Sequence, residues 1–200
     1  MTLLKTDGRL GRSERSRAAV AEALLALIDE GDLRPTAPRI AERAGVSLRL
    51  VFHHFKDLEA VFADAAKREI ERVLPSLKEV SADGPLDKRI DGFLGERTRL
   101  LERVSTMWRA AELQEPFSPE IGKRMKSIRA WMRGETERVF ASELKTIKGN
   151  ERMDVVGAIC AASSMASWLD LRVHQELSVE RARRTVARTL STLLRPLAKK

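Results

Sequence analysis

Several side chains that can hydrogen-bond to phosphates or base edges lie between Thr36 and Lys56, a short stretch of the sequence. A guanidinium such as that of Arg49 can bond to guanine O6 and N7 together, or it can bond to a phosphate. Thr36 suits a phosphate at a helix N-terminus, although its hydroxyl could instead serve only as a cap. The candidate residues for such contacts are Arg12, Thr36, Leu48, Arg49, Leu50, Phe52, His53, His54 and Lys56.

Two short helices must position these groups. Thr36 can cap the first, and Gly45 follows it directly, where a helix end favours a residue that tolerates left-handed backbone angles. Ser47 can cap the second helix, whose inner face would carry Val51 and Phe55. Two short helices joined by a tight glycine-containing turn form a helix-turn-helix. In that motif the second helix enters the major groove of DNA.

The remaining side chains of the second helix offer weaker chemistry. Leu48 and Leu50 could make only apolar contacts with thymine methyl groups. His53 and His54 could each donate a hydrogen bond to a phosphate. Because no third ligand and no nucleophile accompany the histidines, we expect neither a metal site nor catalysis here. The sequence therefore predicts no enzyme and no cofactor.

The stretch R-I-A-E-R-A-G-V-S, followed by V-F-H-H-F and K-D-L-E-A-V-F, resembles the N-terminal domain of TetR-family transcriptional repressors. The match covers about residues 13–66. It implies an all-α protein of about nine helices, with an N-terminal arm and a three-helix helix-turn-helix domain over 1–56. A helical regulatory domain for ligand binding and dimerisation would occupy 57–200. The resemblance also implies a homodimer that binds a palindromic double-stranded DNA operator and responds to a small, mostly apolar effector.

Three residues depart from the family pattern. Phe52 stands where tyrosine is usual, Leu50 replaces a small or hydroxyl residue, and Leu58 replaces a lysine. The changes at Phe52 and Leu58 remove two phosphate donors. Possible substitutes are Lys56, Arg9, Arg12 and Arg15. An alternative function therefore stays open, in which a regulator of the same fold has weakened DNA contacts and is controlled by, or co-activates through, another protein.

Length, charge and cysteine content limit the number of domains, the kind of partner and the cellular compartment. A length of 200 residues allows one or two compact domains, and a net charge of +8 favours an anionic partner. The longest uncharged run, residues 155–169, is shorter than the roughly 20 residues of a membrane-spanning helix. No secretory signal is visible, and Cys160 stands alone. We therefore expect a cytoplasmic protein with no membrane contact.

Helical spacing dominates the whole chain, and no strand pattern is found. The helices that we expect cover about 13–30, 37–44, 48–54, 57–75, 86–113, 118–149, 151–175 and 178–195. A basic arm before the first helix, with Lys5, Arg9 and Arg12, could reach phosphates or a minor groove.

The last two helices are expected to form the dimer interface. The first carries small residues, among them Gly157, Ala158 and Ala161, on which another helix can lie closely. The second has an apolar stripe of Val179, Ala182, Val186, Leu190, Leu193 and Leu194. A four-helix bundle built from two subunits would cover this surface. The alternative is that both helices pack only within their own subunit.

Large, adaptable side chains in the central helices could line an effector pocket. The candidates are Phe93, Met107, Trp108, Phe117, Met125, Trp131, Ser164 and Trp168. No spacing among them is diagnostic of a ligand, and side chains of this kind usually fill a core.

Overall fold

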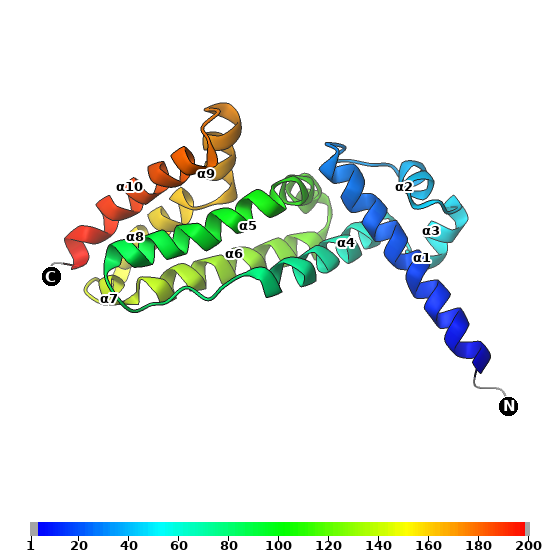
Figure 1. Ribbon diagram of the computed structural model, residues 1–200, viewed down its shortest axis with the longest axis horizontal. Coiled ribbons are helices and arrows are strands. Elements are labelled where there is room, and N and C mark those ends of the chain that lie inside the picture. Colours follow the sequence, from blue (N-terminus) through cyan, green and yellow to red (C-terminus); the bar gives the residue numbers. More distant parts are fainter. Residues whose placement is uncertain (1–3, 199–200) are drawn as a thin grey trace. The chain divides into compact units, whose positions relative to one another are not determined.

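The computed structural model describes residues 4–198, with side chains from Gly11 onward, and this part of the chain is helical without strands (Figure 1). The all-α prediction is confirmed. The α-helices are α1 (Leu4–Asp29), α2 (Ala37–Ala44), α3 (Leu48–His54), α4 (Leu58–Val73), α5 (Leu86–Gln114), α6 (Pro119–Val139), α7 (Ala141–Leu144), α8 (Gly149–Ala162), α9 (Met165–Leu169) and α10 (Val179–Ala198). Short 3₁₀ turns cover Leu74–Ser76 and Glu115–Phe117, and a π-helical turn covers Asp170–His174. None of the helices in the described part is long and apolar enough to cross a membrane.

The chain divides into two compact units. Unit 1 comprises Met1–Pro75 together with Thr106–Lys123, and unit 2 comprises Ser76–Ser105 together with Arg124–Lys200. The chain thus returns to unit 1 at the end of α5 and the start of α6. The functional division at residue 56 stays a prediction.

Local signals in the sequence explain the three helices that follow α1. Gly45 takes the left-handed conformation at the end of α2, with φ of 65°. The Ser47 hydroxyl accepts a hydrogen bond from the Leu50 N–H at 3.2 Å, and Asp57 Oδ1 accepts one from the Ala60 N–H at 2.8 Å. The predicted bounds of α2 and α3 are confirmed.

The first helix is longer than predicted. It begins at Leu4 rather than near residue 13, so the basic arm that we expected before the helix forms its first turns. The side chains of Lys5 and Arg9 lie outside the described residues. Farther along α1, Val20, Leu24 and Ile28 are fully buried and form the inner side of unit 1.

The segment that returns to unit 1 is hydrogen-bonded to two of its helices. Thr106 Oγ1 donates to Asp29 Oδ1 at the end of α1 at 2.7 Å. The buried Ser118 hydroxyl donates to Glu59 Oε1 in the first turn of α4 at 2.5 Å, and it also accepts the Ile121 N–H at the start of α6. This segment is therefore part of the framework of unit 1.

Two helices that the sequence predicted to be continuous are each interrupted in the structure. The helix expected over 118–149 ends at Val139, because Phe140 leaves helical geometry and buries its ring against Phe93 at a centroid distance of 5.2 Å. The helix expected over 151–175 ends at Ala162, where Ser164 caps the new helix α9 by accepting the Ser167 N–H. Both corrections arise from tertiary burial or capping that apolar periodicity does not report.

Four residues of the apolar stripe of α10 belong to the core of their own protomer. Ala182, Leu190 and Leu194 are fully buried, and Val186 is 4 % exposed. The helix packs on α7 and α8 (Figure 1). For these four residues the assignment to a second subunit was wrong, because helices of the same chain already cover them, whereas Val179 is 38 % exposed and Leu193 is half-buried.

Candidate nucleic-acid interface

The helix α3 presents a mixed polar and apolar face to solvent. Val51 is fully buried and Phe55 is 2 % exposed, as expected for its inner side. On the outer side Arg49 and His53 are exposed, and Phe52 is 48 % exposed. Leu48 is exposed as well, whereas Leu50 is half-buried. This sidedness leaves the outer surface of α3 available for contact with a partner.

Arg49 and Thr36 are the two polar groups best placed for this purpose. Among the described residues, no hydrogen-bond or ion-pair partner engages the Arg49 guanidinium. Thr36 is exposed at the N-cap of α2 in an extended conformation, yet its hydroxyl makes no capping hydrogen bond. Pro38 stands in the first turn and has no N–H to offer it. The hydroxyl can therefore bind an oxygen ligand without giving up a cap.

The arginines of α2 are engaged with acidic side chains. Arg39 pairs with Asp32 at 2.5 Å, and Arg43 pairs with Glu30. The hydrogen bond from Arg43 lowers the pKa of the Glu30 carboxyl. The sequence analysis did not identify either pair, because both carboxylates come from the turn that follows α1. Lys56, by contrast, is exposed, with only a long contact of 3.6 Å to Asp57.

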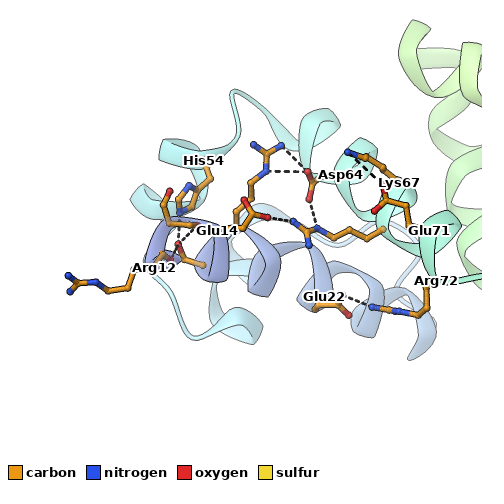
Figure 2. Close-up of polar contacts among 12 residues, drawn as sticks. Arg12, Glu14, Glu22, His54, Asp64, Lys67, Glu71 and Arg72 are labelled. Carbon is orange, nitrogen blue, oxygen red and sulfur yellow. Dashed lines mark hydrogen bonds and ion pairs between the residues drawn. The ribbon is translucent and has the colours of Figure 1, made fainter. Parts of the chain in front are cut away.

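His54 faces α1 rather than the outer surface of α3. Its Nε2 lies 2.6 Å from Ser16 Oγ (Figure 2). The Ser16 hydroxyl also lies within hydrogen-bond distance of the carbonyls of Arg12 and Ser13, and the tautomer of His54 decides whether Nε2 donates to Oγ or accepts from it. Partial burial, His53 and Arg17 lower the pKa of His54 against the opposing charge of Glu14. The geometry thus gives His54 a role in holding α3 on α1.

A network of charged side chains surrounds this contact (Figure 2). Arg17 of α1 lies 5.0 Å from the Phe55 ring centroid and donates to Asp64 Oδ1 of α4 at 2.8 Å. Arg68 bridges the same carboxylate to Glu14 of α1. Although burial opposes the shift, hydrogen bonds from Arg68 and Arg17 lower the pKa of Asp64. The network ties α1, the end of α3 and α4 together through residues that sequence patterns did not identify.

The structure places Arg12 on the exposed surface of α1, where its carbonyl accepts a hydrogen bond from Ser16. Among the described residues, no group of three or more His, Cys, Asp or Glu side chains is arranged to hold a metal ion.

The candidate pocket residues are divided between the two units. Met107 and Trp108 are buried in unit 1, where Trp108 Nε1 donates to Glu112 at 2.7 Å. Phe117, also in unit 1, is 76 % exposed. Those in unit 2 are Phe93, Met125 and Trp168, which are buried, Trp131, which is exposed, and Ser164, which caps α9. The set therefore does not form a single cluster within either unit.

Comparison with known proteins gives structural matches at low sequence identity. No family model matches the sequence, and no curated protein does so. A TetR-family transcriptional regulator from Streptomyces coelicolor matches with a TM-score of 0.71 at 16 % identity, over 93 % of this chain and 83 % of that one. A transcriptional regulator from Rhodococcus sp. Rha1 matches with a TM-score of 0.69 at 19 % identity, over 92 % and 96 %.

A TetR transcription regulator from Haloarcula marismortui matches with a TM-score of 0.61 at 16 % identity, over 93 % of this chain and 97 % of that one. These matches extend over both compact units. The chain therefore has the fold of TetR-family transcriptional regulators.

Proposed function

We propose that this protein is a cytoplasmic, ligand-responsive transcriptional repressor that binds a palindromic DNA operator as a homodimer. The observation that carries the proposal is the outer face of α3, where Arg49 is exposed without a protein partner. Thr36, at the start of α2, adds a hydroxyl that is not used for capping. The fold of known TetR-family regulators supports the same conclusion.

The proposed contacts divide by chemistry. Arg49 can read guanine through two parallel hydrogen bonds, whereas Thr36 and Lys56 suit phosphates, which are the same at every base step. The two recognition helices of a dimer would occupy successive major grooves, so the operator should have twofold symmetry. His54 is left out of the proposed contacts, because Ser16 engages its Nε2.

The proposed dimer surface lies on the outer sides of α8 and α10. Gly157, Ala158 and Ala161 leave the solvent side of α8 flat enough for a helix to approach closely. An open groove of about 420 Å³ continues this surface beside α10, where Thr185 and Thr189 are exposed. A second copy that packs here would bury small and hydroxyl side chains, while the leucines of α10 remain in their own core.

The response to an effector requires a connection to α3. The segment 106–123 is continuous with the parts of α5 and α6 that belong to unit 2. It also bonds to α1 through Asp29 and to α4 through Glu59. A shift of α5 or α6 on effector binding would therefore act on helices that hold α3, which is the coupling that a ligand-responsive repressor needs.

The decisive experiment is titration of selected operator DNA at several salt concentrations. If Arg49 reads guanine, Arg49→Ala should cost about 1–3 kcal/mol and relax preference at one base position per half-site. Thr36→Val should weaken binding to all sequences alike. Lys126→Ala removes an exposed cation of α6 and serves as the matched control. A uniform loss for Arg49→Ala would assign it to a phosphate, and no specific binding by the unmodified protein would refute the proposal.

One observation favours a second function, in which the outer face of α3 binds a protein. Phe52 is 48 % exposed and Leu48 is 41 % exposed on this face. Such apolar groups suit a protein partner at least as well as a DNA groove. If Arg49→Ala and Thr36→Val both leave DNA affinity unchanged, this protein-regulated co-activator becomes the better explanation.

A further inference from the structure

Two arginines of α5 are equally buried, but only one of them has a counter-ion. Arg89 and Arg97 are each 5 % exposed and lie about two helical turns apart. Arg89 pairs with the buried carboxylate of Glu143, with one hydrogen bond of 2.8 Å, and it also donates to the carbonyls of Val139 and Gly84. Its charge is therefore neutralised inside the protein.

Arg97 has only backbone carbonyls as hydrogen-bond partners. It donates to the Met132 carbonyl of α6 at 2.9 Å and, more weakly, to the Ser163 carbonyl at 3.5 Å. Its guanidinium lies 4.7 Å from the Phe93 ring centroid. These bonds use two of the five N–H groups of the guanidinium. Since no fully buried side-chain nitrogen among the described residues lacks a hydrogen-bond partner, the Nε of Arg97, which has none, keeps some accessible surface.

No carboxylate within the described residues contacts Arg97. Glu135 is near enough to favour the charged form, but its Oε1 accepts two hydrogen bonds from Arg138. Burial lowers the pKa of the Arg97 guanidinium to about 10, so it is still charged near neutral pH. Ser163 closes α8, and the helix dipole there supplies only a fraction of a negative charge. A buried cation normally requires a full counter-charge.

We infer that Arg97 is the anchor for the carboxylate of an organic acid, with the apolar part of that acid against Phe93 and Met132. The inference rests on the proposed function, because it names the chemical class of the effector. A carboxylate matches the planar fork of the guanidinium and supplies the missing charge. Phe93 and Met132 are buried, and the partly exposed Cys160 is near enough to Arg97 to favour its charged form.

The test compares acids with alcohols of the same carbon skeleton. The probes are octanoate, decanoate and benzoate, each paired with octanol, decanol or benzyl alcohol. Binding is measured by the thermal midpoint and by Trp fluorescence, and the release of operator DNA is measured separately. At least one acid should raise the midpoint of the unmodified protein and release the operator, while its alcohol should bind about 10- to 100-fold more weakly.

Two variants test whether Arg97 causes the tighter binding of acids than of alcohols. Arg97→Met should remove the difference between acid and alcohol, and Arg97→Lys should retain part of it, because an ammonium keeps the charge without the planar fork. Arg99→Met is the matched control, since that arginine lies on the same helix with a side chain that is 54 % exposed. If Arg97→Met does not fold, the comparison of Arg97→Lys with Arg99→Met decides the assignment.

The possible failures are distinguishable. If the unmodified protein binds its operator but no acid binds in preference to its alcohol, the inference is overturned while the proposed DNA-binding function stands. The same holds if both Arg97 variants bind the acids as tightly as Arg99→Met does. If the unmodified protein binds no operator, the proposed function fails, whatever the acids do.

Discussion

The helices α3 and α10 both have an apolar side and a polar side, but α3 packs on α2, which directly precedes it, whereas α10 packs on α7 and α8, which are separated from it by α9. In α3 the apolar side was assigned to the protein core, where Val51 is fully buried. In α10 the apolar side was assigned to a second subunit, yet Leu190 is fully buried within its own protomer. An apolar stripe shows that a helix is covered, but it does not show what covers it.

The difference lies in the neighbouring signals. The helix α3 is framed by Gly45 and Ser47, whose spacing specifies a turn and therefore the side on which α2 packs. Ser178 caps α10 by accepting the Arg181 N–H at 3.2 Å, but a cap does not specify which helices cover the apolar side, and the partners of α10, the helices α7 and α8, come from separate segments of the chain.

The largest effect should come from placing a charge on the buried side of α10. Leu190→Asp should lower the free energy of unfolding by about 4 kcal/mol or more, since it buries an unpaired carboxylate. Arg188→Asp, on the exposed side, should change it by about 0.5 kcal/mol or less. Urea unfolding followed by circular dichroism measures both. Equal losses would mean that the two sides of α10 are not distinct.

The next largest effect concerns the buried ion pair of unit 2. Glu143→Gln should destabilise the fold by about 3–5 kcal/mol, because it leaves the buried Arg89 charge without a partner. The double variant Arg89→Met, Glu143→Leu should recover most of that loss, because it removes both charges. Calorimetric unfolding of the three proteins provides the measurement. If the double variant is less stable than Glu143→Gln, the two side chains must stabilise the fold through more than their mutual ion pair.

A substitution on the outer face of α8 should weaken the proposed dimer without changing the stability of the folded protomer. Ala161→Arg should weaken the proposed dimer by about 1–3 kcal/mol, because a long side chain would be inserted into a flat surface. Its unfolding as a monomer should be nearly unchanged. Ala130→Arg makes the same substitution on the exposed side of α6 and should leave the dimer intact. Sedimentation at several protein concentrations would contradict the assignment if the two variants associate equally well.

A smaller effect is expected from the inner contacts of α3. Ser16→Ala should reduce operator affinity by about 1 kcal/mol, because it removes the hydrogen bond that holds His54 on α1. The dependence of binding on salt should not change, since Ser16 touches no phosphate. Ser13→Ala alters an exposed serine one turn earlier and is the control. A change in salt dependence for Ser16→Ala would instead place this serine at the DNA backbone.

The smallest effect should be a dependence of stability on pH. Burial and neighbouring positive charges lower the pKa of His54 below its ordinary value of 6.5, so the unfolded chain takes up this proton first as pH falls. Stability from this group is therefore complete above pH 6.5 and declines as pH drops below that value. Asp64, whose lowered pKa lies below 3.8, acts only in a more acidic range. Denaturant unfolding between pH 7.5 and about 5 should show a flatter profile for His54→Gln than for the unmodified protein.

The sequence by itself determined the parts of the fold that local chemistry specifies. The capping residues Thr36, Gly45 and Ser47 predicted the bounds of α2 and α3, and helical periodicity predicted the all-α architecture. These predictions succeeded because caps and periodicity act over a few neighbouring residues, so their consequences can be read in the same short window.

Tertiary structure decided everything that depends on partners from distant segments. The helix α6 ends before Phe140 because that ring is buried against Phe93. The side chain of His54 lies against Ser16, and the candidate pocket residues are divided between two compact units. The tertiary structure also gave Arg89 a counter-ion and left Arg97 without one, although both are buried arginines of one helix. A side chain's type fixes what it can bond to, but only the fold fixes which groups lie within reach.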